Sequence, residues 1–270
     1  TPFTAAELEA APRLEVVARV GVGYDAVEVP ALTRRRVPLM VSGTANSVSV
    51  AEKVMFLMLT LAKRGATMDA LVREGRWWDK FKHLPVDLYQ KTVLIVGFGR
   101  IGTRTARRCV GMEMNVLIYD PYVPADAIRA AGCEPATDLD AALARADFVT
   151  LHCPKTAETA GLINAARLSR MKPTAYLVNT ARGGIVDEAA LEAALKAGKL
   201  GGAGIDVFAR EPAAVDHPLL KLPNVVVAPH VAGVTRESVD RMAIATVRNI
   251  LSMLDRKPIR ENVINKEVLG

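Results

Sequence analysis

An apolar run that ends in three spaced glycines constrains the fold of this chain more than any other stretch. Residues 92–102 read T-V-L-I-V-G-F-G-R-I-G, which predicts a buried strand that turns directly into a helix. In such a unit Gly97 makes the tight turn, and Gly99 lets a phosphate approach the backbone. Gly102 lets the helix pack closely on the strand, while the free N–H groups of the helix start bind the phosphate. The run therefore predicts a phosphate-binding strand–turn–helix unit.

An acid follows this unit at a distance typical of a dinucleotide site. Asp120 ends the next apolar run, N-V-L-I-Y-D, about 20 residues beyond the turn, where a carboxylate can accept hydrogen bonds from ribose hydroxyls. Strand, glycine turn, helix and acid together favour dinucleotide binding. The alternative is a glycine-rich turn of another kind of α/β protein, with Asp120 acting only as a helix cap.

Strands and helices alternate from Lys91 onward, which predicts an α/β fold with a doubly wound parallel sheet. Strands are expected at 92–97, 115–119, 147–152, 174–179, 202–207 and 225–228. Helices are expected near 101–110, 125–131, 164–170, 187–197 and 235–255. Ligands of such sheets bind beyond the carboxyl ends of the strands. That edge would hold Gly97, Asp120, His152, Thr180 and Asp206.

The front of the chain has a different pattern. Short strands are expected at 14–20 and 37–41, and the glycine turn V-G-V-G-Y-D follows the first of them. A capping-box pattern, Ser49-x-x-Glu52, predicts the start of an almost wholly apolar helix at 49–64. A helix that is apolar on most faces packs against more than one neighbour, and a subunit interface is one such neighbour. Beyond this helix, 75–85 is expected to form an ordered loop.

The composition argues against nucleic-acid binding. With 270 residues, 50% of them hydrophobic, the chain can form one large domain or two moderate ones. Its net charge is +6, and the basic clusters at 34–36 and at Arg104, Arg107 and Arg108 are interpreted as solvated faces. Aromatic residues make up 5% of the chain and do not alternate with the basic ones, so no nucleic-acid partner is predicted.

The cysteines and the apolar stretches bear on the cellular compartment. Cys109, Cys133 and Cys153 have no spacing typical of a metal site or a disulfide framework, which suits a reducing cytosol. The longest apolar stretch, 54–62, is interrupted by Thr60 and is too short to span a bilayer. No signal peptide is visible. We therefore expect a cytoplasmic protein with no metal and no membrane association.

Three side chains near strand ends have the chemistry of a catalytic site. Arg182 follows a strand in N-T-A-R-G-G and can make a bidentate contact with a carboxylate. Glu211 precedes a proline, which biases its backbone toward an extended conformation. His230 follows the last strand. Together they fit carboxylate binding beside a histidine that is oriented by an acid.

Each of these residues also has a simpler explanation when it is taken singly. Arg182 would form a surface ion pair, Glu211 would be solvated, and His230 would be structural. Among the other histidines, His83 and His217 fall in loops, and His152 is expected to line a cofactor.

In its motifs the chain resembles the D-isomer-specific 2-hydroxyacid dehydrogenases, a family that includes D-3-phosphoglycerate dehydrogenase and the glyoxylate and hydroxypyruvate reductases. The matching segments follow the family order over nearly the whole chain. They are V-G-V-G-Y-D (20–25), N-S-V-S-V-A-E (46–52), V-G-F-G-R-I-G (96–102), Y-D-P (119–121), L-H-C-P (151–154), T-A-G-L-I-N (159–164), V-N-T-A-R-G-G-I-V-D-E (178–188), G-I-D-V-F-A-R-E-P (204–212) and P-H-V-A-G (229–233).

The resemblance implies roles for the substrate-binding and catalytic residues. His230 would exchange the proton of the substrate hydroxyl while hydride passes between the substrate C2 and the nicotinamide of NAD. Glu211 would hold His230 in the correct tautomer, and Arg182 would bind the substrate carboxylate. The backbone N–H groups of Val22 and Gly23 would also bind that carboxylate.

The resemblance also implies a set of residues that contact the cofactor. Arg100 and Ile101 would lie on the pyrophosphate, and Asp120 on the adenosine ribose. Because Asp120 is followed by a proline, with no arginine beside it, the pattern resembles the members that prefer NAD to NADP. The full implied set is Gly97, Gly99, Arg100, Ile101, Gly102, Asp120, Cys153, Thr180, Ala181, Arg182, Asp206, His230 and Gly233.

The family fold implies two domains. Residues 44–235 would form a Rossmann NAD-binding domain, and residues 1–43 with 236–270 a discontinuous, flavodoxin-like substrate domain. Family members have further βα units before the V-G-V-G-Y-D turn, so we expect the substrate domain to lack its first units. The helix at 49–64 corresponds to the one through which members dimerise, which predicts a homodimer.

The favoured interpretation is an NAD-dependent enzyme acting on a D-2-hydroxy acid or its 2-keto acid, and the motifs most resemble the phosphoglycerate branch. Glyoxylate or hydroxypyruvate reduction is the enzymatic alternative. A third alternative is an NAD(H)-sensing corepressor of the same fold. The Val231-Ala232-Gly233 stretch lacks the tryptophan that those relatives place after the histidine, which argues against this alternative.

Overall fold

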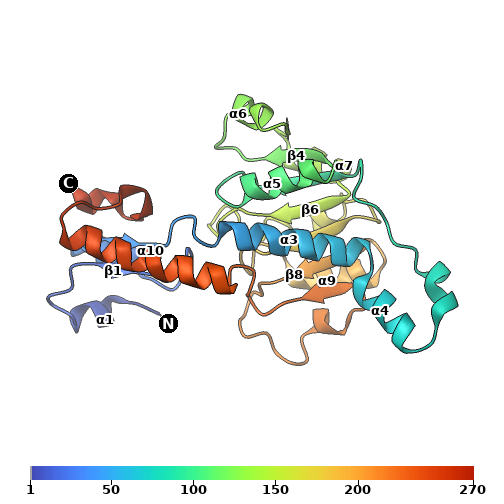
Figure 1. Cartoon of the computed structure of the whole chain (residues 1–270), viewed down its shortest axis with the longest axis horizontal. Coiled ribbons are helices and arrows are strands. Elements are labelled where there is room, and N and C mark those ends of the chain that lie inside the picture. Colours follow the sequence, from blue (N-terminus) through green and yellow to red (C-terminus); the bar gives the residue numbers. More distant parts are fainter. Residues whose placement is uncertain (1) are drawn as a thin grey trace. The chain divides into compact units, whose positions relative to one another are not determined.

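The computed structural model describes residues 2–270 and divides the chain into two compact units (Figure 1). The central unit contains Val50–Ala232. The terminal unit combines residues 2–49 with Gly233–Gly270, so both ends of the chain contribute to it. The breaks between the units fall a few residues from the expected domain limits at 44 and 235.

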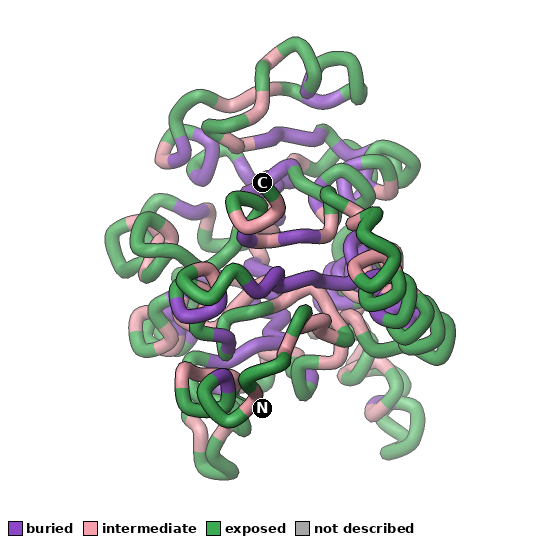
Figure 2. Tube along the Cα trace, turned by 90° about the vertical axis from the view of Figure 1, so that its left-hand side faces the viewer, coloured by how far each residue is buried: buried purple, intermediate pink, exposed green. Residues whose placement is uncertain are grey.

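The central unit is built on a seven-stranded parallel sheet with the order β5-β4-β3-β6-β7-β8-β9. The strands are β3 (Thr92–Val96), β4 (Asn115–Tyr119), β5 (Glu134–Pro135), β6 (Phe148–Leu151), β7 (Tyr176–Asn179), β8 (Gly202–Ile205) and β9 (Val225–Val227). Every residue of β6 and β8 is buried. Figure 2 shows how buried stretches of the chain alternate with exposed ones. The predicted doubly wound parallel sheet is confirmed. The edge strand β5 was not predicted, because two residues, one of them proline, have no strand pattern.

Helices cover both faces of this sheet. They are α3 (Ser47–Ala62), α4 (Gly65–Arg73), α5 (Gly102–Gly111), α6 (Ala125–Ala130), α7 (Leu139–Arg145), α8 (Ala165–Leu168) and α9 (Glu188–Lys196), with 3-10 turns η1 (Trp77–Lys82) and η2 (Pro218–Lys221). One core cluster packs α3, α5 and α6 against the sheet, and a second core cluster packs α7, α8 and α9 against it. The sequence prediction missed α4 and α7, although Asp138 is a recognisable cap that accepts two N–H groups of α7.

The terminal unit joins segments that are far apart in sequence. Its elements are α1 (Ala5–Glu9), β1 (Val17–Ala18), α2 (Val29–Arg34), β2 (Leu39–Met40), α10 (Arg236–Leu254), η3 (Arg260–Asn262) and η4 (Lys266–Leu269). β1 and β2 pair in parallel. Buried polar side chains connect the two parts: Asn249 of α10 donates to Val41 O (2.9 Å), and Asn265 accepts Leu39 N–H (2.8 Å).

The predicted capping box at Ser49 is wrong. Helix α3 begins at Ser47, which places Ser49 inside its first turn. The Ser49 hydroxyl is buried, forms a hydrogen bond with the Thr235 hydroxyl (3.2 Å) and accepts one from Arg241 (3.3 Å). The Ser49 hydroxyl therefore makes tertiary hydrogen bonds and does not form the helix cap that the local sequence pattern predicted.

Candidate functional site

The glycine turn after β3 has a different requirement at each glycine. Gly97 has φ 98°, and a Cβ there would lie 2.8 Å from the backbone nitrogen of Cys153. A Cβ at Gly102 would lie 2.0 Å from Gly97 O, so strand and helix could not pack as they do. At Gly99, by contrast, a Cβ would meet no atom within 4 Å. Packing thus requires the first and third glycines, whereas Gly99 leaves open space where a ligand can approach the backbone.

The start of α5 offers donors to an anion. Its N-cap residue, Ile101, makes no side-chain cap hydrogen bond, and the first turn contains no acidic residue. The first N–H groups of a helix lack intrahelical acceptors, and the helix dipole favours negative charge there. This helix start, including Arg100 and Ile101, therefore suits a phosphate.

Asp120 closes the glycine turn from the neighbouring strand. One carboxylate oxygen accepts Phe98 N–H (2.7 Å) and the other accepts Tyr122 N–H (2.9 Å). The N-cap of the following helix α6 is Pro124, so Asp120 does not cap a helix. Since each carboxylate oxygen can accept more than one hydrogen bond, Asp120 retains acceptor capacity for ribose hydroxyls.

A buried polar atom near this edge also fits a cofactor. The Thr180 hydroxyl, at the end of β7, is buried without a hydrogen-bond partner. Buried hydroxyls in proteins are normally paired, so this one suits a ligand atom. Together with the open space at Gly99, it indicates that the residues present fit a dinucleotide.

Arg182 lies in a turn that a buried asparagine shapes. The Asn179 side chain donates to Arg182 O (3.0 Å) and accepts Ala181 N–H (3.0 Å). The Arg182 guanidinium donates to Ala181 O (2.7 Å) and is partly exposed. A Cβ at Gly183 would lie 1.8 Å from Phe208 O, so this turn touches the loop after β8. The sheet therefore brings the Arg182 turn directly against the segment that leads to Glu211.

Glu211 and His230 form a hydrogen-bonded pair. The Glu211 Oε2 to His230 Nδ1 distance is 2.7 Å, and Glu211 Oε1 accepts Phe208 N–H (3.0 Å). The carboxylate only accepts, so it assigns the proton of the neutral imidazole to Nδ1 and leaves Nε2 as an acceptor. The side chains are 48% exposed for His230 and 35% exposed for Glu211, which leaves the pair accessible to a ligand. This is the geometry of an oriented general base.

Buried Asp206 holds the backbone of His230. His230 has φ 52°, in the left-handed region that non-glycine residues seldom adopt. Its N–H donates to Asp206 O (2.7 Å), and the Asp206 carboxylate accepts the N–H groups of Val231 (3.0 Å) and Ala232 (2.8 Å). Sequence suggested Asp206 only as a residue lining the cofactor. Its carboxylate also fixes the direction in which His230 points.

The remaining residues at this edge do not act as bases or nucleophiles at neutral pH. Burial lowers the pKa of His152 to about 3, so its ring is neutral, and Nε2 lies 3.2 Å from the Thr150 hydroxyl. Burial raises the pKa of the Cys153 thiol to about 11, and it also raises the pKa of Cys109, which lies near the end of α5 and not at this edge, to about 12. Both thiols therefore stay protonated.

Three of the residues expected at the site belong to the terminal unit. Gly21 has φ 134°, and its N–H donates to the Ser42 hydroxyl (3.0 Å), which shapes the turn containing the partly exposed Val22 and Gly23. A Cβ at Gly233 would lie 2.8 Å from the Asn46 side-chain nitrogen, so the Asn46 side chain would have to move to admit a larger residue.

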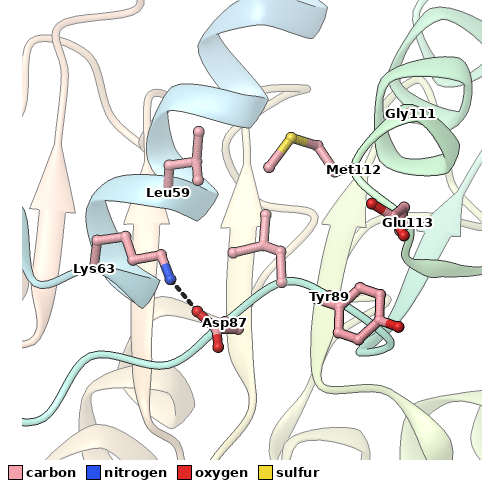
Figure 3. Close-up of a pocket in the computed structure, with 8 residues that line it drawn as sticks. Leu59, Lys63, Asp87, Tyr89, Gly111, Met112 and Glu113 are labelled. Atoms are coloured by element: carbon pink, nitrogen blue, oxygen red, sulfur yellow. Dashed lines mark hydrogen bonds and ion pairs between the residues drawn. The ribbon is translucent and has the colours of Figure 1, made fainter.

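One surface hollow lies away from the candidate site. Figure 3 shows a hollow of about 290 Å³ next to the Lys63–Asp87 ion pair, lined also by Tyr89 and Glu113. Tyr89 and Glu113 lie a few residues before β3 and β4, so the hollow lies at the amino ends of these strands. Ligands of parallel sheets bind at the opposite ends.

The described residues contain neither a membrane-spanning helix nor a cluster of metal ligands. Within residues 2–270, no helix combines the length and apolar character needed to cross a bilayer. In the same range, no three His, Cys, Asp or Glu side chains are placed to hold a metal ion.

Comparison with known proteins identifies the family. Residues 55–232 match the model of the D-isomer specific 2-hydroxyacid dehydrogenase NAD binding domain. The chain belongs to this family, and its central unit contains the family's NAD-binding domain.

Curated relatives bear different substrate names. A D-3-phosphoglycerate dehydrogenase of Archaeoglobus fulgidus is 40% identical over 98% of this chain and 50% of its own length. A glyoxylate reductase of Korarchaeum cryptofilum is 42% identical over 99% of this chain and 81% of its own length. The chain thus spans only half of the first relative. Identity of this level to both leaves the substrate unresolved.

A solved structure has the same fold. The D-lactate dehydrogenase of Aquifex aeolicus, crystallised with NAD and lactic acid, superposes with a TM-score of 0.87 at 30% identity. The match covers 99% of this chain and 84% of that chain.

Proposed function

We propose that this protein is an NAD-dependent dehydrogenase of D-2-hydroxy acids, with activity like that of D-3-phosphoglycerate dehydrogenase. The observation that supports this most is the 2.7 Å pair of Glu211 and His230, next to the loop that contacts the Arg182 turn. A general base and a carboxylate-binding arginine are what the oxidation of a hydroxy acid needs beside a nicotinamide.

Three side chains of the central unit have defined roles in this proposal. The cofactor supplies hydride transfer when it is bound. His230 takes the hydroxyl proton on Nε2 during oxidation and returns it during reduction, and Glu211 holds the ring by Nδ1. Arg182 binds the substrate carboxylate. In the terminal unit, the N–H groups of Val22 and Gly23 remain predicted carboxylate donors.

Cofactor binding is assigned to the turn and strand ends. The N–H groups around Gly99 to Gly102 would hold the pyrophosphate, and Asp120 would hold the ribose hydroxyls. The residues that would line the ribose and the nicotinamide are Cys153, Thr180, Asp206 and the stretch 230–233. A 2′-phosphate would face the carboxylate of Asp120, which favours NAD over NADP.

Glyoxylate reduction is the second candidate. Its support is the Korarchaeum cryptofilum relative, which matches this chain over 81% of its own length. The test is a panel of 2-keto acids, including 3-phosphohydroxypyruvate, hydroxypyruvate and glyoxylate, followed by NADH absorbance. Highest kcat/KM with the phosphorylated acid supports the first candidate, and highest kcat/KM with glyoxylate supports the second. A protein that binds NADH but reduces none of the acids would contradict both and favour a corepressor-like binding protein.

We also propose that the protein is a homodimer. Large apolar side chains of α3 and of the segment after α4 are exposed: Phe56 (53%), Trp77 (55%), Trp78 (74%) and Phe81 (65%). Exposed aromatic side chains are often buried at interfaces. Sedimentation should give twice the mass of one chain, whereas a monomer at micromolar concentration would contradict the proposal.

We further propose a cytoplasmic location, which the free cysteines suit.

A further inference from the structure

The dipeptide Phe208–Ala209 lies between the main parts of the catalytic edge. Phe208 N–H donates to Glu211 Oε1 (3.0 Å), and the Arg182 turn packs against Phe208 O through Gly183. Any movement of this dipeptide would therefore displace both Glu211 and the Arg182 turn.

A second acid–histidine pair holds the dipeptide from α9 and the segment before η2. Glu188, the first residue of α9, accepts Ala209 N–H at Oε1 (2.6 Å). The other oxygen, Oε2, lies 3.2 Å from His217 Nε2. Both side chains are only 19% exposed, compared with 48% for His230. The pair that is remote from the reacting atoms is thus the better packed one.

His217 is fixed on both ring nitrogens. Nδ1 accepts Leu219 N–H (3.3 Å), so the neutral ring has its proton on Nε2 and donates to Glu188. The ring also packs edge-on against Phe208, with 5.3 Å between ring centroids. His217 therefore contacts the dipeptide directly, and it also acts on it through Glu188.

We propose that Glu188 and His217 are positioning residues, which fix Phe208–Ala209 and thereby the orientation of Glu211 toward His230. This inference rests on the proposed function, in which His230 exchanges the substrate proton. Glu211 and His230 are too exposed for packing alone to hold them, so their geometry depends on the loop between β8 and Glu211. Glu188 and His217, both only 19% exposed, anchor this loop from outside it.

The main test compares Glu188→Ala with Glu188→Gln. Glu188→Ala removes the acceptor of Ala209 N–H and should lower kcat about 10- to 100-fold, because small displacements of catalytic groups cost that much. It should also shift the pH–rate profile and leave the NADH dissociation constant unchanged. Glu188→Gln keeps an oxygen acceptor for Ala209 N–H but turns an NH2 donor toward the Nε2–H of His217, so it should restore kcat in part. Glu192→Ala is the matched control, since Glu192 lies one turn along α9 and pairs with Lys196.

A second variant keeps the test decisive if Glu188→Ala does not fold. His217→Phe retains a ring against Phe208 but loses both hydrogen bonds, and it should change kcat and the pH–rate profile in the same direction. A folded Glu188→Ala or His217→Phe protein with the parent kcat and pH–rate profile would overturn the inference. If His230→Ala is as active as the parent, it is the proposed function that has failed.

Discussion

The glycine turn after β3 and the catalytic edge at β7 to β9 are built in different ways. The turn is local: Gly97, Gly102 and the start of α5 are close in sequence, and Asp120 of the next strand closes it. The catalytic edge joins Arg182, Glu211 and His230 from three separate loops. Substitutions in the turn should therefore weaken cofactor binding first, whereas substitutions at the catalytic edge should lower turnover.

The largest expected effect separates the two regions completely. His230→Ala should lower kcat about 10²- to 10⁴-fold, because it removes the general base, and leave NADH affinity nearly unchanged. Stopped-flow measurement of turnover and fluorescence titration of NADH would show this. A variant with normal kcat would refute the role of His230.

Two glycines sharpen the comparison through stability. Gly183→Ala should destabilise the protein by about 1–3 kcal/mol, because its Cβ would overlap the backbone of Phe208. Gly99→Ala, with open space around its Cβ, should change stability by less than about 0.5 kcal/mol but weaken NADH binding. Urea unfolding and NADH titration of both variants measure these effects. Equal stability losses would contradict the distinction.

Asp120 tests how the turn selects its cofactor. Asp120→Ala should weaken NAD binding several-fold and raise the relative use of NADP, because the carboxylate no longer opposes a 2′-phosphate. The ratio of kcat/KM values for the two cofactors is the measurement. If NADP use stays negligible, another group determines the choice.

The last effect is absent at neutral pH and concerns stability in acid. Burial lowers the pKa of His152 to about 3, so the unfolded chain binds a proton that the folded protein does not between pH 6.5 and 3. His152 therefore costs no stability at pH 7.5 and destabilises the fold as pH falls below 6.5, by about 1.4 kcal/mol per pH unit. His152→Gln should reduce the loss of unfolding free energy per pH unit in acid. The difference in unfolding free energy between variant and parent at pH 7.5 measures the effect of the substitution on packing alone. An unchanged slope would contradict the assignment.

Much of the sheet could be predicted, because buried strands such as β3 contain a continuous apolar run, here residues 93–96. The prediction failed where elements were short or where a partner was distant. β5 has only two residues, and the capping role assigned to Ser49 was wrong because Thr235 and Arg241 engage its hydroxyl. A local pattern contains no information on such partners.

For the candidate site, the sequence predicted the catalytic residues but not the residues that position them. Asn179, Gly183 and Glu188 fall inside recognisable motifs, yet nothing in the spacing shows that they shape the turns of Arg182 and Glu211. His217 does lie in a loop, as expected, but its packing against Phe208 was not predicted. A strand-end asparagine and an acid at a helix start were the available signals.

The sequence by itself determined the parallel sheet, the glycine turn and the identity of the chemical groups, because apolar periodicity and glycine geometry are local properties of the chain. Only the tertiary structure decided that Glu211 contacts His230, that Asp206 holds the left-handed backbone of His230, and that Glu188 and His217 hold the loop between them. These contacts join loops that follow different strands, and the parallel order of the sheet brings those loops together.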